Sequence, residues 1–270
     1  MNLSTPTIWG ITKGHSPVVA AAIHDGHHVR EEVSRILALT DAERLREEDP
    51  FTAIWTEVAE TRIIGSQSRF EVDLNRPREK AVYIRPEDAW GLRVWQERPD
   101  EQLISRSLAG YDAFYSEVHN LLTDIARHFG HFVVFDLHSY NHRRDGRNAP
   151  PAEQEENPEV NIGTGTVVNE KWTPLIQRFM ADLRAFDFMG RHLDVRENVK
   201  FRGGQFARWI HESFPNSGCA IAIEFKKFFM DEWTGEPDMM GINTIQHALQ
   251  STLLGVEEEI DILNRAEKKI

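Results

Sequence analysis

Residues 132–144 read FVVFDLHSYNHRR, a stretch that joins an apolar, β-branched half to a strongly polar one. A short apolar run of this kind is typical of a buried strand. The polar half places an acid, two histidines, a serine and two arginines within nine residues. The stretch therefore predicts a strand. Its polar end is either an ordinary connection to a loop or part of the edge of an active site.

Two other apolar runs end in residues that are capable of chemistry. PVVAAAI (17–23) is followed by His24, and GCAIAIEF (218–225) carries Glu224 next to its end. Amphipathic segments lie between the runs, and the longest, 101–130, repeats apolar residues at helical spacing. Buried strands that alternate with such helices predict an α/β fold with a mostly parallel, mixed sheet flanked by helices. In such sheets, ligands bind beyond the carboxyl ends of the strands.

The same patterns predict the remaining segments. We expect further helices over 28–39, 51–63, 170–189, 204–213 and 240–267, a capped helical turn after Thr40, a strand or turn within 63–74, and polar loops over 75–100 and 150–159. The chain shows no internal repeat and no clear domain boundary, so a single domain over residues 1–270 is the prediction.

The composition argues against several classes of function. Lys plus Arg is 31 and Asp plus Glu is 43, and the resulting net charge of −12 argues against nucleic acid as a partner. No stretch approaches the roughly 18 apolar residues of a membrane span, and the N-terminal residues show no secretory signal. We therefore expect a soluble, cytoplasmic protein of unknown oligomeric state. The one cysteine, Cys219, lies in an apolar run and is expected in the core.

His24 and His138 lie at the ends of predicted strands, so one sheet would bring both to the same edge. Imidazole is the commonest zinc ligand, and catalytic zinc takes three protein ligands and keeps one open position. Asp136 shares a face of its strand with His138 and is expected to orient the ring. The third ligand stays open between His27, Asp25 and the acids at 47–49.

Other polar residues suit the surroundings of such a metal. Glu224 follows an apolar stretch, so burial would raise its pKa and suit it as a general base, with an ion pair to Lys226 or Lys227 as the alternative. Guanidinium groups bind carboxylates in a bidentate manner, so clustered arginines predict an anionic substrate. The candidates for this role are Arg69, Asn75, Arg76, Arg143, Arg144 and Arg202, the last followed by the Gly203-Gly204 pair.

Five motifs in this order resemble the N-formylglutamate amidohydrolase family. They are AIHDGHHVR (22–30), SRFEVDLNRP (68–77), FDLHSY (135–140), FRGG (201–204) and IAIEF (221–225). That family is similar in fold and chemistry to the zinc carboxypeptidases and aspartoacylase-like hydrolases. The resemblance thus implies a zinc-carboxypeptidase-like (phosphorylase/hydrolase-like) fold and a zinc-dependent hydrolase. The implied substrate is a small anionic N-acyl amino acid such as N-formyl-L-glutamate.

The resemblance also implies roles for individual residues. His24 and His138 would bind the metal, with Asp49 as the third ligand and His27 as its rival. Glu224 would be the general acid and base. Asn75 and Arg76 would hold the substrate carboxylate, Arg69 would assist at the reacting carbonyl, and Arg143 and Arg202 are expected to reach the substrate.

Two other functions are compatible with these residues. One is a carboxypeptidase-like enzyme or a deacylase that acts on another N-acyl amino acid, and the other is a non-catalytic anion-binding protein of the same fold. A serine nucleophile is disfavoured because no G-x-S-x-G motif surrounds Ser139, which we interpret as a loop residue or as a hydrogen-bonding neighbour of the ligands.

Overall fold

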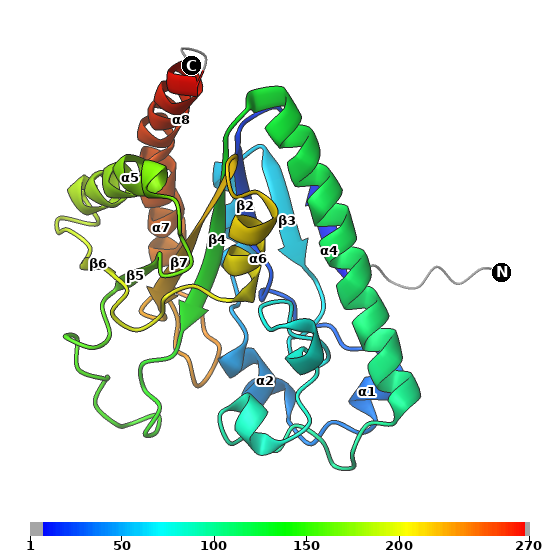
Figure 1. Ribbon diagram of the computed structural model, residues 1–270. Helices are drawn as coiled ribbons and strands as arrows, with labels where there is room; N and C mark the ends of the chain where they lie inside the picture. Colours follow the sequence, from blue (N-terminus) through cyan, green and yellow to red (C-terminus); the bar gives the residue numbers. More distant parts are fainter. Residues whose placement is uncertain (1–7, 268–270) are drawn as a thin grey trace.

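Seven strands form one mixed sheet in the order β1-β3-β2-β4-β7-β5-β6 (Figure 1). The structure, a computed structural model, describes residues 8–267. The strands are β1 (Trp9–Thr12), β2 (Val18–Ala22), β3 (Thr61–Gly65), β4 (Phe132–Tyr140), β5 (Val160–Gly163), β6 (Val195–Glu197) and β7 (Gly218–Lys226). The neighbouring strands β3, β2, β4 and β7 are parallel, whereas β1 and β5 pair antiparallel with β3 and β7. The predicted α/β class is confirmed.

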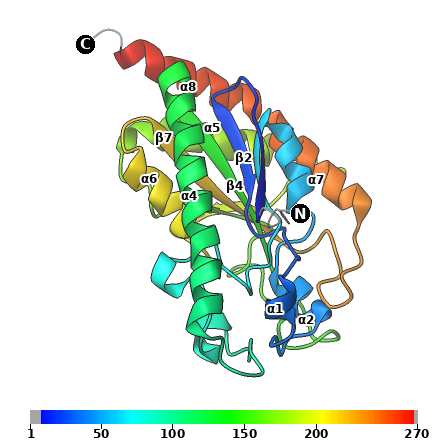
Figure 2. The same cartoon turned by 90° about the vertical axis from the view of Figure 1, so that its right-hand side faces the viewer.

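Helices cover both faces of the sheet (Figures 1 and 2). They are α1 (Glu31–Ser34), α2 (Asp41–Glu47), α3 (Thr52–Trp55), α4 (Glu101–Phe129), α5 (Thr173–Ala185), α6 (Gln205–Ser213), α7 (Met239–Ser251) and α8 (Leu253–Glu267), with 3-10 turns at Thr56–Val58, Arg78–Lys80, Pro86–Ala89 and Glu170–Trp172. The helices α4 and α6 pack on one face, and α3, α5, α7 and α8 pack on the other.

The alternation of side chains along β4 explains this arrangement. Val134 packs with α4 and α6, whereas Val133 and Phe135 pack with the helices of the opposite face. Successive residues of a strand point to opposite faces, and every residue of β4 is buried. Cys219 of β7 is fully buried in the same core, as expected.

The predicted long helix over 28–39 is wrong. Only Glu31–Ser34 is helical, because the residues after it pair with the segment that precedes α4. The Ala38 amide donates to the Val94 carbonyl at 2.8 Å, and the Gln96 amide donates to the Ile36 carbonyl at 2.8 Å. The apolar spacing in this stretch therefore reflects packing against that segment.

The predicted helix over 51–63 is also too long. It ends in a 3-10 turn at Thr56–Val58, and β3 begins at Thr61. Ile63 belongs to the sheet, where it pairs in register with Ala21 of β2. The short strands β1, β5 and β6 were not predicted, and the helix over 240–267 is interrupted at the buried Thr252.

Residues 75–100 form more than the polar surface loop that we expected. Tyr83, Val94 and Trp95 are buried and pack with Val33 and Phe70 in a separate hydrophobic cluster. This segment lies with α1 and α2 beyond the carboxyl ends of the parallel strands (Figure 1). It therefore forms one wall over the edge of the sheet at which ligands are expected.

Within residues 8–267, none of the helices combines the length and the apolar character that crossing a membrane requires. The prediction that the N-terminus carries no secretory signal falls partly on residues 1–7, which lie outside the described residues.

Candidate metal and active site

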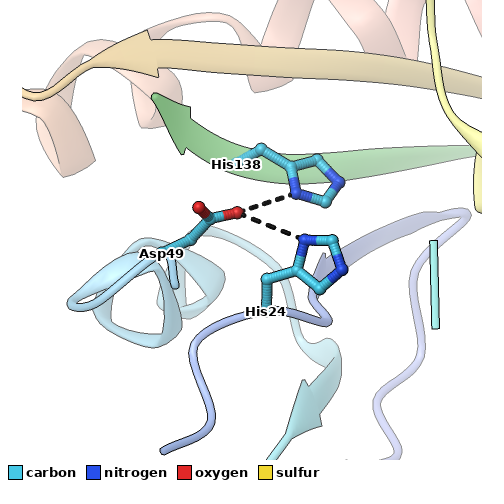
Figure 3. Close-up of side chains that lie close together, drawn as sticks. All are labelled: His24, Asp49 and His138. Carbon is cyan, nitrogen blue, oxygen red and sulfur yellow. Dashed lines mark hydrogen bonds and ion pairs between the residues drawn. The ribbon is translucent and has the colours of Figure 1, made fainter. Parts of the chain in front are cut away.

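His24, Asp49 and His138 meet at the carboxyl edge of the sheet (Figure 3). The side chains of all three are almost completely buried. Asp49 Oδ2 lies 3.0 Å from His138 Nδ1 and 3.5 Å from His24 Nδ1. His24 follows β2, His138 lies in the neighbouring β4, and Asp49 lies between α2 and α3. The sheet therefore brings together the two histidines that the sequence predicted.

This donor set fits a zinc ion. Two ligands of a tetrahedral zinc ion, each bound at 2.0–2.2 Å, lie roughly 3.3 Å apart. The separations of 3.0 and 3.5 Å around Asp49 Oδ2 are close to this value. His24 Nδ1 is buried without a hydrogen-bond partner in the described chain, as expected of an atom that awaits a ligand.

Each imidazole is oriented through its other nitrogen by a buried carboxylate. His24 Nε2 lies 2.7 Å from Asp73 Oδ1, and His138 Nε2 lies 2.9 Å from Asp136 Oδ1. Such carboxylate contacts fix the ring orientation and increase its basicity as a metal ligand. The contact of Asp136 with His138 matches the role that was expected of it. The contact of Asp73 with His24 was not predicted.

Asp49 is held by main-chain contacts on both sides. Its amide donates to the His24 carbonyl at 3.0 Å, and Lys227 Nζ donates to the carbonyl of the preceding Glu48 at 2.7 Å. Burial alone would raise the pKa of the Asp49 carboxyl, but the contacts with His138 and His24 outweigh it and hold this pKa well below its usual range. The group is thus an ionised carboxylate.

The other candidates for the third ligand lie elsewhere. His27 Nδ1 pairs with Glu48 Oε2 at 2.5 Å, and this imidazole is partly exposed. Asp25 Oδ1 accepts a hydrogen bond from the Ala53 amide at 3.0 Å, at the start of α3. Neither residue joins His24 and His138, so Asp49 remains the candidate that the geometry favours.

Glu224 lies beside His138, its register partner on β7. Both side chains therefore project from the same face of the sheet into the same cavity. Burial raises the pKa of the Glu224 carboxyl to about 8, only partly opposed by His138. The alternative ion pairs are not formed in the described chain, since Lys226 and Lys227 donate to main-chain carbonyls.

Most of the predicted anion-binding residues line a cavity of about 270 Å³ around these groups. These residues are Arg69, Asn75, Arg76, Arg144, Arg202, Gly203 and Gly204. Arg69 is held by Asp73 Oδ2 at 2.8 Å, and its guanidinium stacks over the Trp90 ring at 4.9 Å. Asn75 Nδ2 lies 3.5 Å from His138 Nε2, which places this amide next to the candidate metal ligands.

Arg143 is not brought into this cavity. Its amide donates to Glu232 at 2.8 Å and its carbonyl accepts from Trp233. These two main-chain contacts hold Arg143 within the loop that follows β4. The neighbouring Arg144 is among the lining residues instead, and it contacts Glu47 at 3.2 Å.

A model of the N-formylglutamate amidohydrolase family matches residues 16–230, which is most of the chain. The chain belongs to this family. Membership confirms the resemblance that the sequence motifs suggested and indicates an amidohydrolase. No curated protein matches the chain.

Two solved structures share the fold of this N-formylglutamate amidohydrolase family member. One is an N-formylglutamate amidohydrolase from Ralstonia eutropha, at 17% identity and a TM-score of 0.73, with 96% of this chain and 99% of that chain covered. The other is a gene product from Agrobacterium tumefaciens, at 17% identity and a TM-score of 0.63, with 92% and 96% covered. At this identity, the likeness establishes the fold alone.

Sequence reasoning missed three residues of the family member's site. Asp73 lies inside the DLNR motif, so its position between Arg69 and Asn75 was a usable signal. Lys227 follows Glu224 by three residues, and burial lowers the pKa of its ammonium to about 8. Trp90 lies in a segment with many charges, and the sequence offered no signal for its place at the cavity.

Proposed function

We propose that the protein is a metal-dependent amidohydrolase that cleaves the amide of an N-acyl acidic amino acid, with N-formyl-L-glutamate as the first candidate. The observation that carries the proposal is the meeting of His24, Asp49 and His138 beside a protonatable Glu224. An anion-binding protein without catalysis has no use for a partly buried carboxyl at that place.

His24, Asp49 and His138 are the proposed ligands of one divalent ion, and two imidazoles with one carboxylate suit zinc. When bound, zinc supplies Lewis acidity, which polarises a carbonyl and acidifies a water molecule. Asp73 and Asp136 hold the two imidazole rings in the orientation that this role requires.

Glu224 is the proposed general base and acid. A carboxyl whose pKa is near neutrality accepts the proton of the attacking water and then returns it to the amine that leaves. The water oxygen first bonds to the carbonyl carbon, the carbon–nitrogen bond then breaks, and one water is consumed. For N-formyl-L-glutamate, the products are formate and L-glutamate.

Substrate binding is assigned to the cationic side of the cavity. Asn75 and Arg76 are proposed to hold a substrate carboxylate, and Arg202 is a further contact from the neighbouring loop. Arg69 is proposed to stabilise the negative charge that develops on the carbonyl oxygen. Burial lowers the pKa of Arg69, but Asp73, Tyr83 and Asp49 together outweigh it and raise this pKa well above its usual value, so the guanidinium stays charged.

Elemental analysis and an activity assay test the proposal together. We expect about one zinc or similar divalent ion per chain in the wild type and its loss in His138→Ala. The wild type should release formate from N-formyl-L-glutamate. A protein that holds no metal, and that gains no activity when divalent ions are added, would rule out the proposed mechanism.

A further inference from the structure

Ser139 and Asn141 line the cavity with polar atoms that the proposed reaction does not use. The two residues are 7% and 2% exposed. Ser139 Oγ and Asn141 Oδ1 have no hydrogen-bond partner within residues 8–267. Nearly all buried polar atoms in proteins are hydrogen-bonded to protein, water or a ligand, so these two atoms are able to bond a polar group that enters the cavity.

The strand register places both residues on the same face as Lys227. Ser139 pairs with Phe225, which packs in the core beneath α3 and α7. Asn141 lies two residues further on, and the Lys227 amide donates to the Tyr140 carbonyl at 3.0 Å. Side chains in register on adjacent strands point to the same side of the sheet.

Lys227 keeps one donor for a ligand. Its ammonium has three N–H groups, and two are used by the carbonyls of Arg46 at 2.6 Å and Glu48 at 2.7 Å. Because Lys227 also lines the cavity, the third N–H is available to an acceptor there.

These three residues lie across the metal ligands from Asn75. Asn75 Oδ1 accepts from the Phe206 amide of α6, on the face of the sheet that α4 and α6 cover. The His138 ring separates the two sides, with Nε2 at 3.5 Å from Asn75 and Nδ1 at 3.0 Å from Asp49. A substrate that spans the cavity therefore meets Asn75 with one end and Lys227 with the other.

We propose that Ser139, Asn141 and Lys227 form a second binding subsite, which takes a neutral polar group of the carboxamide or carbamoyl class on the acyl side of the scissile amide. The inference rests on the proposed function, because it specifies the acyl group for the same site. A carbamoyl group offers an acceptor to Lys227 and N–H donors to Asn141 Oδ1. A formyl group carries only a hydrogen on its carbonyl carbon and so offers no N–H donor. A carboxylate offers acceptors alone.

Calorimetric titration of two ligands tests the subsite. N-carbamoyl-L-glutamate and N-formyl-L-glutamate are titrated into metal-loaded Glu224→Gln protein, which lacks the proposed base, and into the same protein with Ser139→Ala or Asn141→Ala added. We expect tighter binding of the carbamoyl compound before truncation. Each truncation should weaken that binding about three- to tenfold, the usual effect of one hydrogen bond, and leave formyl binding within about twofold.

Ser107→Ala is the matched control. Ser107 is 3% exposed on α4 and accepts a hydrogen bond from Arg30 at 2.6 Å, far along the chain from the cavity residues. This change should lower the melting temperature and leave both affinities unchanged. Ser139→Ala should instead leave the melting temperature unchanged and weaken the binding of the carbamoyl compound. The melting temperature stays the same because the hydroxyl of Ser139 has no hydrogen bond to lose within residues 8–267.

Three results would overturn the subsite. They are equal affinity for the two compounds before truncation, no binding of the carbamoyl compound, and affinities that Ser139→Ala and Asn141→Ala leave unchanged. A failure of the proposed function is recognised separately. Protein with Glu224 intact would then turn over neither compound, while the preference for the carbamoyl ligand and its loss in the truncated variants would remain.

Discussion

Glu224 differs from glutamine chiefly in its capacity to exchange a proton, so one substitution separates catalysis from binding. We predict that Glu224→Gln lowers kcat on N-formyl-L-glutamate by about 10²- to 10⁴-fold, the usual contribution of a general base. Substrate affinity and metal content should stay close to wild type, because Glu224 is proposed neither to bind the substrate nor to coordinate the metal. Steady-state kinetics and elemental analysis measure these quantities. Turnover that survives the change would remove Glu224 from the mechanism.

In the proposed site, Asp136 would act on the metal only through His138, to which its Oδ1 atom lies at 2.9 Å. We predict that Asp136→Asn weakens zinc affinity about 10- to 100-fold, the usual effect of losing such a carboxylate. Competition with a chromophoric chelator measures the affinity. Asp112→Asn is the control, since Asp112 pairs with Arg78 on the surface. Equal zinc affinity in Asp136→Asn and wild type would show that the contact does not orient the ring.

At the scale of elements, the sequence predicts those whose pattern is long or strongly apolar. The helix α4 has a continuous apolar face, a capping Asp100 that accepts from the Leu103 amide, and Gly130 at its end in the left-handed region. Short helices such as α1 and α3 lack such signals. Their ends are determined by contacts with distant segments, which the local sequence does not contain.

The same distinction applies to the site. His24, His138 and Glu224 were predictable because each ends a buried strand, and parallel strands align these ends. Asp49 follows a short helix, and only the resemblance to the family singled it out. The contact of Lys227 with the carbonyl of Glu48 joins residues 179 positions apart, so no local pattern reveals it.

Gly204 links α6 to the side of the cavity that is proposed to bind the substrate. A Cβ atom on Gly204 would lie 2.2 Å from Asn75 Oδ1, which the Phe206 amide holds at 2.9 Å. We predict that Gly204→Ala displaces the Asn75 side chain, raises KM about tenfold or more, and costs about 1–3 kcal/mol of stability. Kinetics and thermal unfolding measure both effects. Gly10→Ala is the control, because its added Cβ meets nothing within 4 Å, and an unchanged KM in Gly204→Ala would contradict the assignment of Asn75.

At the scale of the whole molecule, the fold also buries a polar group that takes no part in the proposed reaction, and its titration affects the stability of the folded protein. His211 of α6 is 6% exposed, accepts from the Ala220 amide of β7 at 2.9 Å and contacts Thr166 at 3.1 Å. It therefore joins a helix, a central strand and the loop after β5. Burial lowers the pKa of His211 from 6.5 to about 4, so the folded protein holds this imidazole neutral.

This depressed pKa predicts a specific loss of stability in acid. Between pH 6.5 and about 4, the unfolded chain binds a proton at His211 and the folded chain does not, so stability falls as the pH falls. The contribution is fully present above pH 6.5 and reaches about 3 kcal/mol. We predict that His211→Gln, which keeps an acceptor for Ala220, reduces this part of the pH dependence in chemical unfolding at pH 7 and pH 5. His247→Gln on the exposed side of α7 should leave the dependence unchanged, and identical slopes in His211→Gln and wild type would refute the assignment.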